Sequence, residues 1–161
     1  MKIEAKLTES SPSLNREKQF VLMGLPFDFV SIPESAQLIE QAISSKKRCF
    51  LSTPNINFTI AAHEDDAFYQ SVAVSDLSVI DGMPLVWLAK MMDLPVKERV
   101  AGSDLFQFLS DTPREKPIRV FFFGGEPGVA KQAHEQLNSY SRGMVSVGFY
   151  VGKQSRILIV L

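Results

Sequence analysis

The chain has 161 residues and a formal net charge of −1, and 45% of its residues are hydrophobic. This composition is typical of a soluble globular protein of one domain, and the near-neutral charge predicts no nucleic-acid partner. The single cysteine, Cys49, excludes a disulfide framework within the chain and a cysteine-rich zinc site, and its apolar neighbours favour a buried thiol over a nucleophile.

Residues 1–19 are polar and contain no apolar core segment, so we interpret them as a flexible lead-in rather than a signal peptide. Residues 20–161 are interpreted as a single α/β domain. No apolar run approaches the ~20 residues that a membrane-spanning helix needs. We expect a cytoplasmic protein, and the composition also allows peripheral contact with the inner face of the membrane.

The first half of the domain predicts strands that alternate with helices. The apolar segment 20–30 predicts a strand that ends near Gly24, then a loop; a helix begins near Ser31 and ends at the basic residues 46–48. The further elements are a strand at 48–52, helices at 54–63 and 65–74, a strand at 77–80, and helices at 83–92 and 103–109.

Two of these helices carry specific expectations. The segment 83–92 (MPLVWLAKMM) is so apolar that we expect a buried helix, with Trp87 in the core. Ser103 is expected to cap the helix at 103–109.

The second half continues the alternation. The loop 111–116 (DTPREK) is the best candidate for a division between two halves. The expected elements after it are strands at 118–123, 144–149 and 157–161, with a helix at 126–140 that has Pro127 in its first turn. Strands alternating with helices predict a layered, mostly parallel, Rossmann-like α/β sheet with helices on both faces.

Polar residues gather where the predicted strands end, which is where ligands bind in open α/β sheets. Thr53, Asn55 and Asn57 follow one strand, and Asp81 and Gly82 follow the next. A third polar turn holds Arg99, Gly102 and Asp104, and the sequence GGEPG, with Gly124 and Gly125, follows the strand at 118–123.

Each turn has a functional and a structural interpretation. Asp81 suits a general base, or a helix N-cap before residue 83. Thr53 and Asn55 suit hydrogen bonds to a sugar or phosphate, or local capping around Pro54. Arg99 suits a phosphate contact, or a solvated side chain. The GGEPG amides suit a phosphate cradle, or a tight turn. The two histidines lie in no cluster with metal-ligand spacing, so we expect no metal site.

Four motifs in order resemble the WecG/TagA/CpsF glycosyltransferases: STPNINF, SDLSVIDGMPLVWLAKMM, ERVAGSDLF and VFFFGGEPGVA. The resemblance runs from about residue 23 to about residue 148. It implies an inverting hexosyltransferase that moves a sugar from a UDP-sugar to a polyprenyl-diphosphate-linked saccharide, with no cofactor and no catalytic metal. The products of this family feed teichoic acid, enterobacterial common antigen, capsule and exopolysaccharide in the bacterial cell envelope.

The resemblance also implies residue roles. Asp81 would deprotonate the acceptor hydroxyl, and Thr53 would act beside it in the catalytic pair. The implied substrate-binding residues are Asn55, Asn57, Gly82, Arg99, Gly102, Asp104, Gly124 and Gly125.

The resemblance dissolves after Gly148, whereas family members usually continue with further strands and a basic membrane-directed tail. We therefore expect a C-terminally shortened form, and a non-catalytic remnant or binding module of the same fold is the alternative. An unrelated nucleotide-binding domain, such as an oxidoreductase, is disfavoured because the sequence contains no GxGxxG. The apolar strand at 157–161 would leave an open sheet edge, which predicts self-association into a homo-oligomer.

Overall fold

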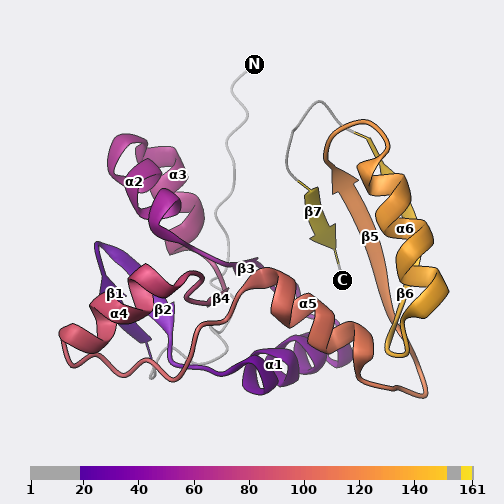
Figure 1. Cartoon of the computed structure of the whole chain (residues 1–161), viewed down its shortest axis with the longest axis horizontal. Helices are drawn as coiled ribbons and strands as arrows, with labels where there is room; N and C mark the ends of the chain where they lie inside the picture. The colour runs from indigo at the N-terminus through magenta and orange to yellow at the C-terminus, as the bar shows by residue number, and fades with distance from the viewer. Residues whose placement is uncertain (1–18, 152–156, 161) are drawn as a thin grey trace. The chain divides into compact units, whose positions relative to one another are not determined.

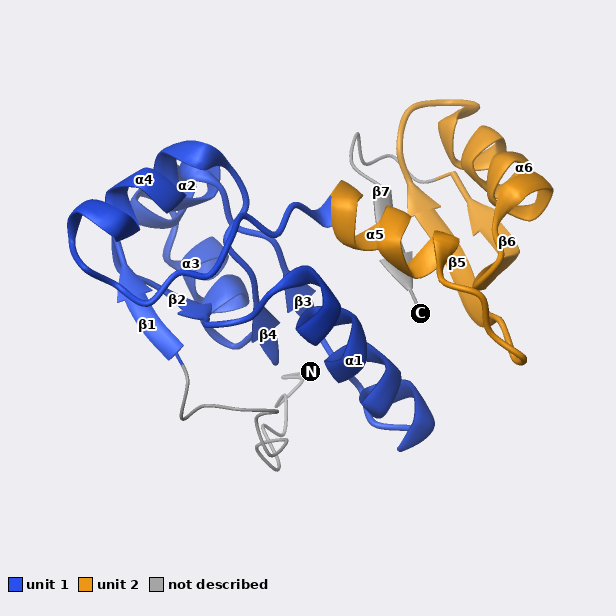
Figure 2. Cartoon of the chain, turned by 60° about the horizontal axis from the view of Figure 1, so that its bottom comes forward, with its two compact units in different colours: residues 1–102 blue, residues 103–161 orange. Residues whose placement is uncertain are grey.

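The structure is a computed structural model, which describes residues 19–151 and the backbone of residues 157–160. The expected lead-in therefore lies outside the described residues, apart from Gln19. The chain forms two compact units that divide between Gly102 and Ser103 (Figure 2). The expected division at 111–116 is wrong, because the helix before that loop belongs to the second unit.

The first unit opens with an antiparallel hairpin of β1 (Gln19–Leu22) and β2 (Leu25–Asp28). The two residues between the strands, Met23 and Gly24, have φ angles of 49° and 79°. Two central residues with positive φ make the tight turn that matches the twist of a hairpin. The loop expected after Gly24 is wrong, because the chain returns as a second strand whose apolar side chains are buried.

Helix α1 (Ile32–Ser44) begins with a capping box. The Ser31 hydroxyl accepts a hydrogen bond from the Glu34 N–H, and the Glu34 carboxylate accepts one from the Ser31 N–H. The helix ends one turn earlier than expected, so the basic residues 46–48 follow it and do not lie in its last turn.

A short parallel pair lies at the centre of this unit (Figure 1). Strand β3 (Leu51–Ser52) pairs with β4 (Leu77–Ser78), and α2 (Ile56–Glu64) and α3 (Asp66–Ala73) connect them. Both strands fall within the segments predicted from the sequence, and each is shorter than predicted.

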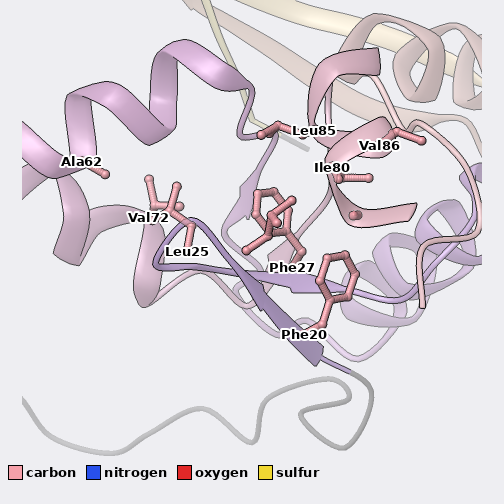
Figure 3. Close-up of a cluster of buried hydrophobic side chains, with 10 residues drawn as sticks. Phe20, Leu25, Phe27, Ala62, Val72, Ile80, Leu85 and Val86 are labelled. Carbon is pink, nitrogen blue, oxygen red and sulfur yellow. The ribbon is translucent and has the colours of Figure 1, made fainter. Parts of the chain in front are cut away.

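The core of the first unit forms between the hairpin and three helices (Figure 3). Phe20 and Phe27 stack across the hairpin with ring centroids 5.8 Å apart. The buried cluster is made of Phe20, Leu22, Leu25, Phe27, Ala62, Val72, Ile80, Leu85, Val86 and Ala89. Ile80, which follows β4 by two residues, belongs to this core and directly precedes Asp81.

Helix α4 (Met83–Met91) buries only one side. Leu85, Val86 and Ala89 belong to the core, whereas Trp87 is 58% exposed. The expectation that Trp87 is a core residue is therefore wrong. The high apolar content predicts burial on all sides, but the core contacts only one face of the helix.

The second unit is a three-stranded sheet with two helices. Strand β5 (Ile118–Gly124) is central, with β6 (Met144–Tyr150) parallel on one side and β7 (Ile157–Val160) antiparallel on the other. Helix α5 (Gly102–Asp111) joins this unit, and its Phe106 ring lies 6.0 Å from the Phe122 ring of β5. Ser103 is thus inside the helix and not its cap.

Helix α6 (Val129–Tyr140) covers β6. The Nδ1 atom of His134 lies 2.7 Å from Oγ of Ser146, and the Asn138 amide bonds both backbone groups of Ser146. The helix begins after Gly128, which has a φ of 91°, so Pro127 precedes the helix instead of lying in its first turn.

The predicted Rossmann-like α/β class is confirmed, since helices alternate with short parallel pairs, β3–β4 and β5–β6. The N-terminal hairpin and β7 add antiparallel pairings that the sequence pattern did not indicate. Within the described residues, no helix combines the length and the apolar content needed to cross a membrane.

Candidate active site

Backbone hydrogen bonds bring two of the predicted polar turns together at the end of β4. The N–H of Val79 donates to the Ser52 carbonyl at 3.0 Å, and the N–H of Asp81 donates to the Pro54 carbonyl, also at 3.0 Å. The parallel pairing thus continues past the short strands. As a result, the turn that holds Thr53 lies directly beside Asp81.

The opposite edge of β4 has no strand partner among the described residues at Ser78. There the carboxylate of Asp28 accepts a hydrogen bond from the Ser78 N–H at 2.7 Å, and its other oxygen accepts one from Gln19 at 3.0 Å. Asp28 is buried, and burial raises the pKa of this carboxyl above its ordinary value of 3.8, against the opposing effect of both hydrogen bonds. Sequence analysis missed Asp28; the only signal was a carboxylate in an otherwise apolar strand.

Two residues further along the same edge, the Val100 N–H donates to the Ile80 carbonyl at 2.8 Å. This bond brings the third polar turn to the end of β4. Nη1 of Arg99 consequently lies 3.9 Å from Oδ1 of Asp81. The two side chains are 39% and 25% exposed, so a ligand in solution can reach both charges.

The segment before Arg99 is tied to the start of α1. The Glu98 carboxylate accepts a hydrogen bond from the Ile32 N–H at 2.7 Å, and the Lys97 ammonium bonds the Glu34 carboxylate. That ammonium holds the pKa of Glu34 at about 2, well below its ordinary value. Arg99 is therefore held by contacts on both sides of it in the chain.

The capping interpretation of Asp81 is wrong. The N-cap of α4 is Gly82, with a φ of 96°, and this cap makes no side-chain hydrogen bond. Asp81 therefore precedes the N-cap and is not the capping residue itself. A Cβ placed on Gly82 would lie 3.8 Å from Cβ of Asn55, so these two turns are in close contact.

The capping interpretation of Asn55 is confirmed. Its Oδ1 atom accepts hydrogen bonds from the N–H groups of Asn57 and Phe58, at 3.0 and 3.2 Å. Both capping hydrogen bonds are accepted by the side-chain oxygen of Asn55, and its amide NH₂ takes no part in the cap. Asn57 lies exposed in the first turn of α2.

Thr53 lies against Gly102. A Cβ added to Gly102 would meet Cγ2 of Thr53 at 3.3 Å and its Oγ1 at 3.5 Å. A larger residue at position 102 would press on the Thr53 side chain. Six predicted site residues thus meet around the ends of β3 and β4: Thr53, Asn55, Asp81, Gly82, Arg99 and Gly102.

Of the four remaining predicted residues, Asn57 lies in α2 of the first unit and the other three lie in the second unit. Asp104 is in the first turn of α5, and Gly124 and Gly125 have φ angles of 91° and 81° at the end of β5. The positive φ angles confirm a tight turn at GGEPG. A role for these three residues in binding stays a prediction.

The chemistry available at the end of β4 is that of a carboxylate beside a cation. Such a pair can take a proton from a hydroxyl and bind an anionic group next to it. In the described part of the chain, no three His, Cys, Asp or Glu residues are grouped as metal ligands. Burial raises the pKa of Cys49 to about 11, which supports the prediction that this thiol is not a nucleophile.

Known proteins share this sequence pattern. The model of the Glycosyl transferase WecG/TagA/CpsF family matches residues 20–156. An N-acetylglucosaminyldiphosphoundecaprenol N-acetyl-beta-D-mannosaminyltransferase of Bacillus spizizenii is 27% identical over 110 residues, which cover 68% of this chain and 43% of that protein. A protein of the same name from Bacillus subtilis is 26% identical over 121 residues, which cover 70% of this chain and 47% of that protein. The chain therefore spans less than half the length of these two curated relatives.

Proposed function

Because the chain belongs to the WecG/TagA/CpsF glycosyl transferase family, we propose that it transfers a hexose from a UDP-sugar to a saccharide linked to a polyprenyl diphosphate. The acceptor class follows the names of the Bacillus relatives, which specify an N-acetylglucosaminyl-diphosphoundecaprenol and an N-acetylmannosaminyl group. The reaction serves the synthesis of a cell-envelope polysaccharide and takes place at the inner face of the membrane.

The pair of Asp81 and Arg99 carries the proposal. The Asp81 carboxylate takes the proton of the acceptor hydroxyl while that oxygen attacks the anomeric carbon of the donor sugar. The bond from this carbon to the diphosphate breaks on the opposite face, so the configuration inverts and UDP leaves. Arg99 binds the diphosphate, whose negative charge grows as it leaves.

The neighbouring turns supply positioning groups. Thr53 donates a hydrogen bond from its hydroxyl, and Asn55 donates from its amide NH₂, since its Oδ1 already accepts the capping bonds. Gly82 and Gly102 leave the space next to Asn55 and Thr53 free of a further side chain. The family resemblance extends the proposal to Asn57, Asp104, Gly124 and Gly125 as further substrate-binding residues.

The test is transfer itself. The chain is incubated with UDP-N-acetylmannosamine and an N-acetylglucosaminyl-diphosphopolyprenol, and the lipid product and released UDP are measured. We expect equal amounts of disaccharide lipid and UDP, with the new linkage inverted relative to the donor. Binding of UDP without any transfer would favour the non-catalytic binding module.

A further inference from the structure

Helix α4 exposes an apolar face that the core of its unit does not use. Met83, Trp87 and Met91 are spaced four residues apart, so they lie along one side of the helix. They are 41%, 58% and 81% exposed, respectively. The face formed by these three residues is called the Met–Trp–Met face below.

This arrangement is unusual for a surface helix. Such a helix normally turns charged residues outward, and one that is apolar all round is normally buried. The only charged residue of α4 is Lys90, which borders the Met–Trp–Met face and is exposed. The helix contains no acidic residue. An exposed apolar face of this kind is typical of a surface that binds another protein or a membrane.

We propose that the Met–Trp–Met face lies on an anionic lipid bilayer and brings Asp81 to the level of the lipid headgroups. Tryptophan prefers the interface between headgroups and acyl chains, and a flanking lysine extends its ammonium to anionic phosphates. The nine residues of α4 are too few to span a bilayer but suit a helix that lies in its plane.

The position of the face relative to the candidate site gives it a function. Helix α4 starts two residues after Asp81, with only Gly82 between them. A lipid-linked acceptor has its diphosphate and sugar at the membrane surface, and therefore a carboxylate at the end of a membrane-bound helix is at the height of the acceptor. This step rests on the proposed function, whereas the binding of the face to lipid does not depend on catalysis.

A second copy of the chain is a weaker candidate for the partner of this face. A stable protein interface buries ~800 Å² on each partner. Three side chains on one helix fall well short of that area. Reversible binding to a membrane needs no such area, because each inserted apolar side chain adds to the affinity and the basic side chain adds attraction to anionic lipid.

Trp87 is the only tryptophan in the chain, so its fluorescence reports on this face alone. The full chain is titrated with vesicles of phosphatidylcholine and phosphatidylglycerol. We expect the emission of a water-exposed indole to shift to shorter wavelength on binding, and lipids brominated in the acyl chain to quench it. An emission spectrum that is unchanged at vesicle concentrations in large excess would overturn the proposal.

Two variants with an introduced aspartate separate the face from general apolarity. Met91→Asp should weaken vesicle binding by ~10-fold or more, since a Met side chain loses its burial and an anion faces anionic lipid. Val74→Asp is the matched control, because Val74 is 64% exposed at the end of α3 and is not part of the face. It should bind within ~2-fold of the original chain. Equal losses in the two variants would refute a role for the Met–Trp–Met face.

The remaining outcomes identify other partners of the face. A Trp87 emission already typical of a buried indole without vesicles, together with a concentration-dependent mass in ultracentrifugation, would assign the face to a second copy and refute lipid binding. Vesicle binding without sugar transfer would keep this inference and refute the proposed function. Transfer to a soluble acceptor analogue without any vesicle binding would keep the proposed function and refute lipid binding by the Met–Trp–Met face.

Discussion

Arg99 lies 3.9 Å from Asp81 although the two residues come from different turns. The neighbours of each residue explain this closeness, because the Val100 N–H bonds the Ile80 carbonyl at 2.8 Å. This backbone hydrogen bond thus holds the two residues close together and places their side chains side by side. A cation fixed beside a carboxylate at a strand end is the feature on which the proposed sugar transfer depends.

Arg99→Gln should weaken the binding of UDP by ~10-fold or more, because it removes the charge that faces the diphosphate. Isothermal titration with UDP measures this. Arg48→Gln, which removes an exposed arginine that belongs to none of the three turns, should leave the affinity unchanged. If both variants bind UDP as the original chain does, Arg99 is not a diphosphate ligand.

Gly82→Ala should destabilise the protein by ~1–3 kcal/mol through backbone strain. The φ of 96° at Gly82 disfavours any side chain, although the space around an added Cβ is adequate, with its nearest neighbour at 3.8 Å. Gly102→Ala is the comparison, since its backbone lies outside the positive-φ region and its Cβ would only press on Thr53. Urea unfolding of both variants tests this, and an equal or larger loss for Gly102→Ala would contradict the strain argument.

Asp28→Ala should cost ~1–3 kcal/mol in the free energy of unfolding, because it leaves the buried Ser78 N–H without an acceptor. Asp28→Asn keeps an acceptor oxygen of the same shape and should cost clearly less. Urea unfolding at neutral pH compares the two variants. Similar losses would show that the carboxylate charge, and not hydrogen bonding to β4, makes Asp28 important.

The same residue predicts a pH dependence. The pKa of Asp28 is raised in the folded protein from 3.8, so the folded state holds a proton that the unfolded state has already released. Stability from this group therefore falls as the pH rises from about 3.8 to the raised pKa, and is constant above it. Asp28→Asn lacks this contribution.

The measurement is the difference in the free energy of unfolding between the original chain and Asp28→Asn across this pH range. It should decline with rising pH. The Glu34 carboxyl, whose pKa is about 2, has the opposite dependence at lower pH, but it is present in both proteins and cancels from the difference. A difference that grows with pH would mean that the pKa of Asp28 is lowered on folding.

The sequence predicted the parts of the site that depend on local pattern. Strand ends followed by polar residues were enough to single out Thr53 and Asp81, and the fold class followed from alternating strands and helices. The role of Asp28 was not predictable, because its partner Ser78 is far along the chain and the contact requires the tertiary fold. The hairpin was not predictable for a different, local reason. Its turn places Met23 at a left-handed φ, which is uncommon for methionine and gives no turn signal in the sequence.

Trp87 shows a second limit. An apolar composition indicates that a side chain is favoured away from water, but it does not indicate whether that side chain packs in the protein core or against a partner. In α4 the core contacts the side that carries Leu85 and Ala89, and Trp87 points away from it. A helix with one buried face and one apolar exposed face has the same composition as a fully buried helix, and only the structure separates the two.

The central claim is that the Asp81 carboxylate removes the proton of the acceptor hydroxyl, and replacing it with an amide tests this most directly. Asp93→Asn is the matched control, because Asp93 is an exposed residue of the same unit with a φ of 54°, a conformation that asparagine accepts. Both variants should keep the far-UV spectrum and the unfolding midpoint of the original chain to within the small change expected at a partly exposed site.

The measurement is the rate of disaccharide-lipid formation at saturating UDP-sugar and acceptor. Asp81→Asn should lower this rate by at least ~10²-fold, the usual scale for loss of a general base, while Asp93→Asn retains it. UDP affinity should stay within a few-fold in both variants. Transfer by Asp81→Asn at the rate of the original chain would contradict the account.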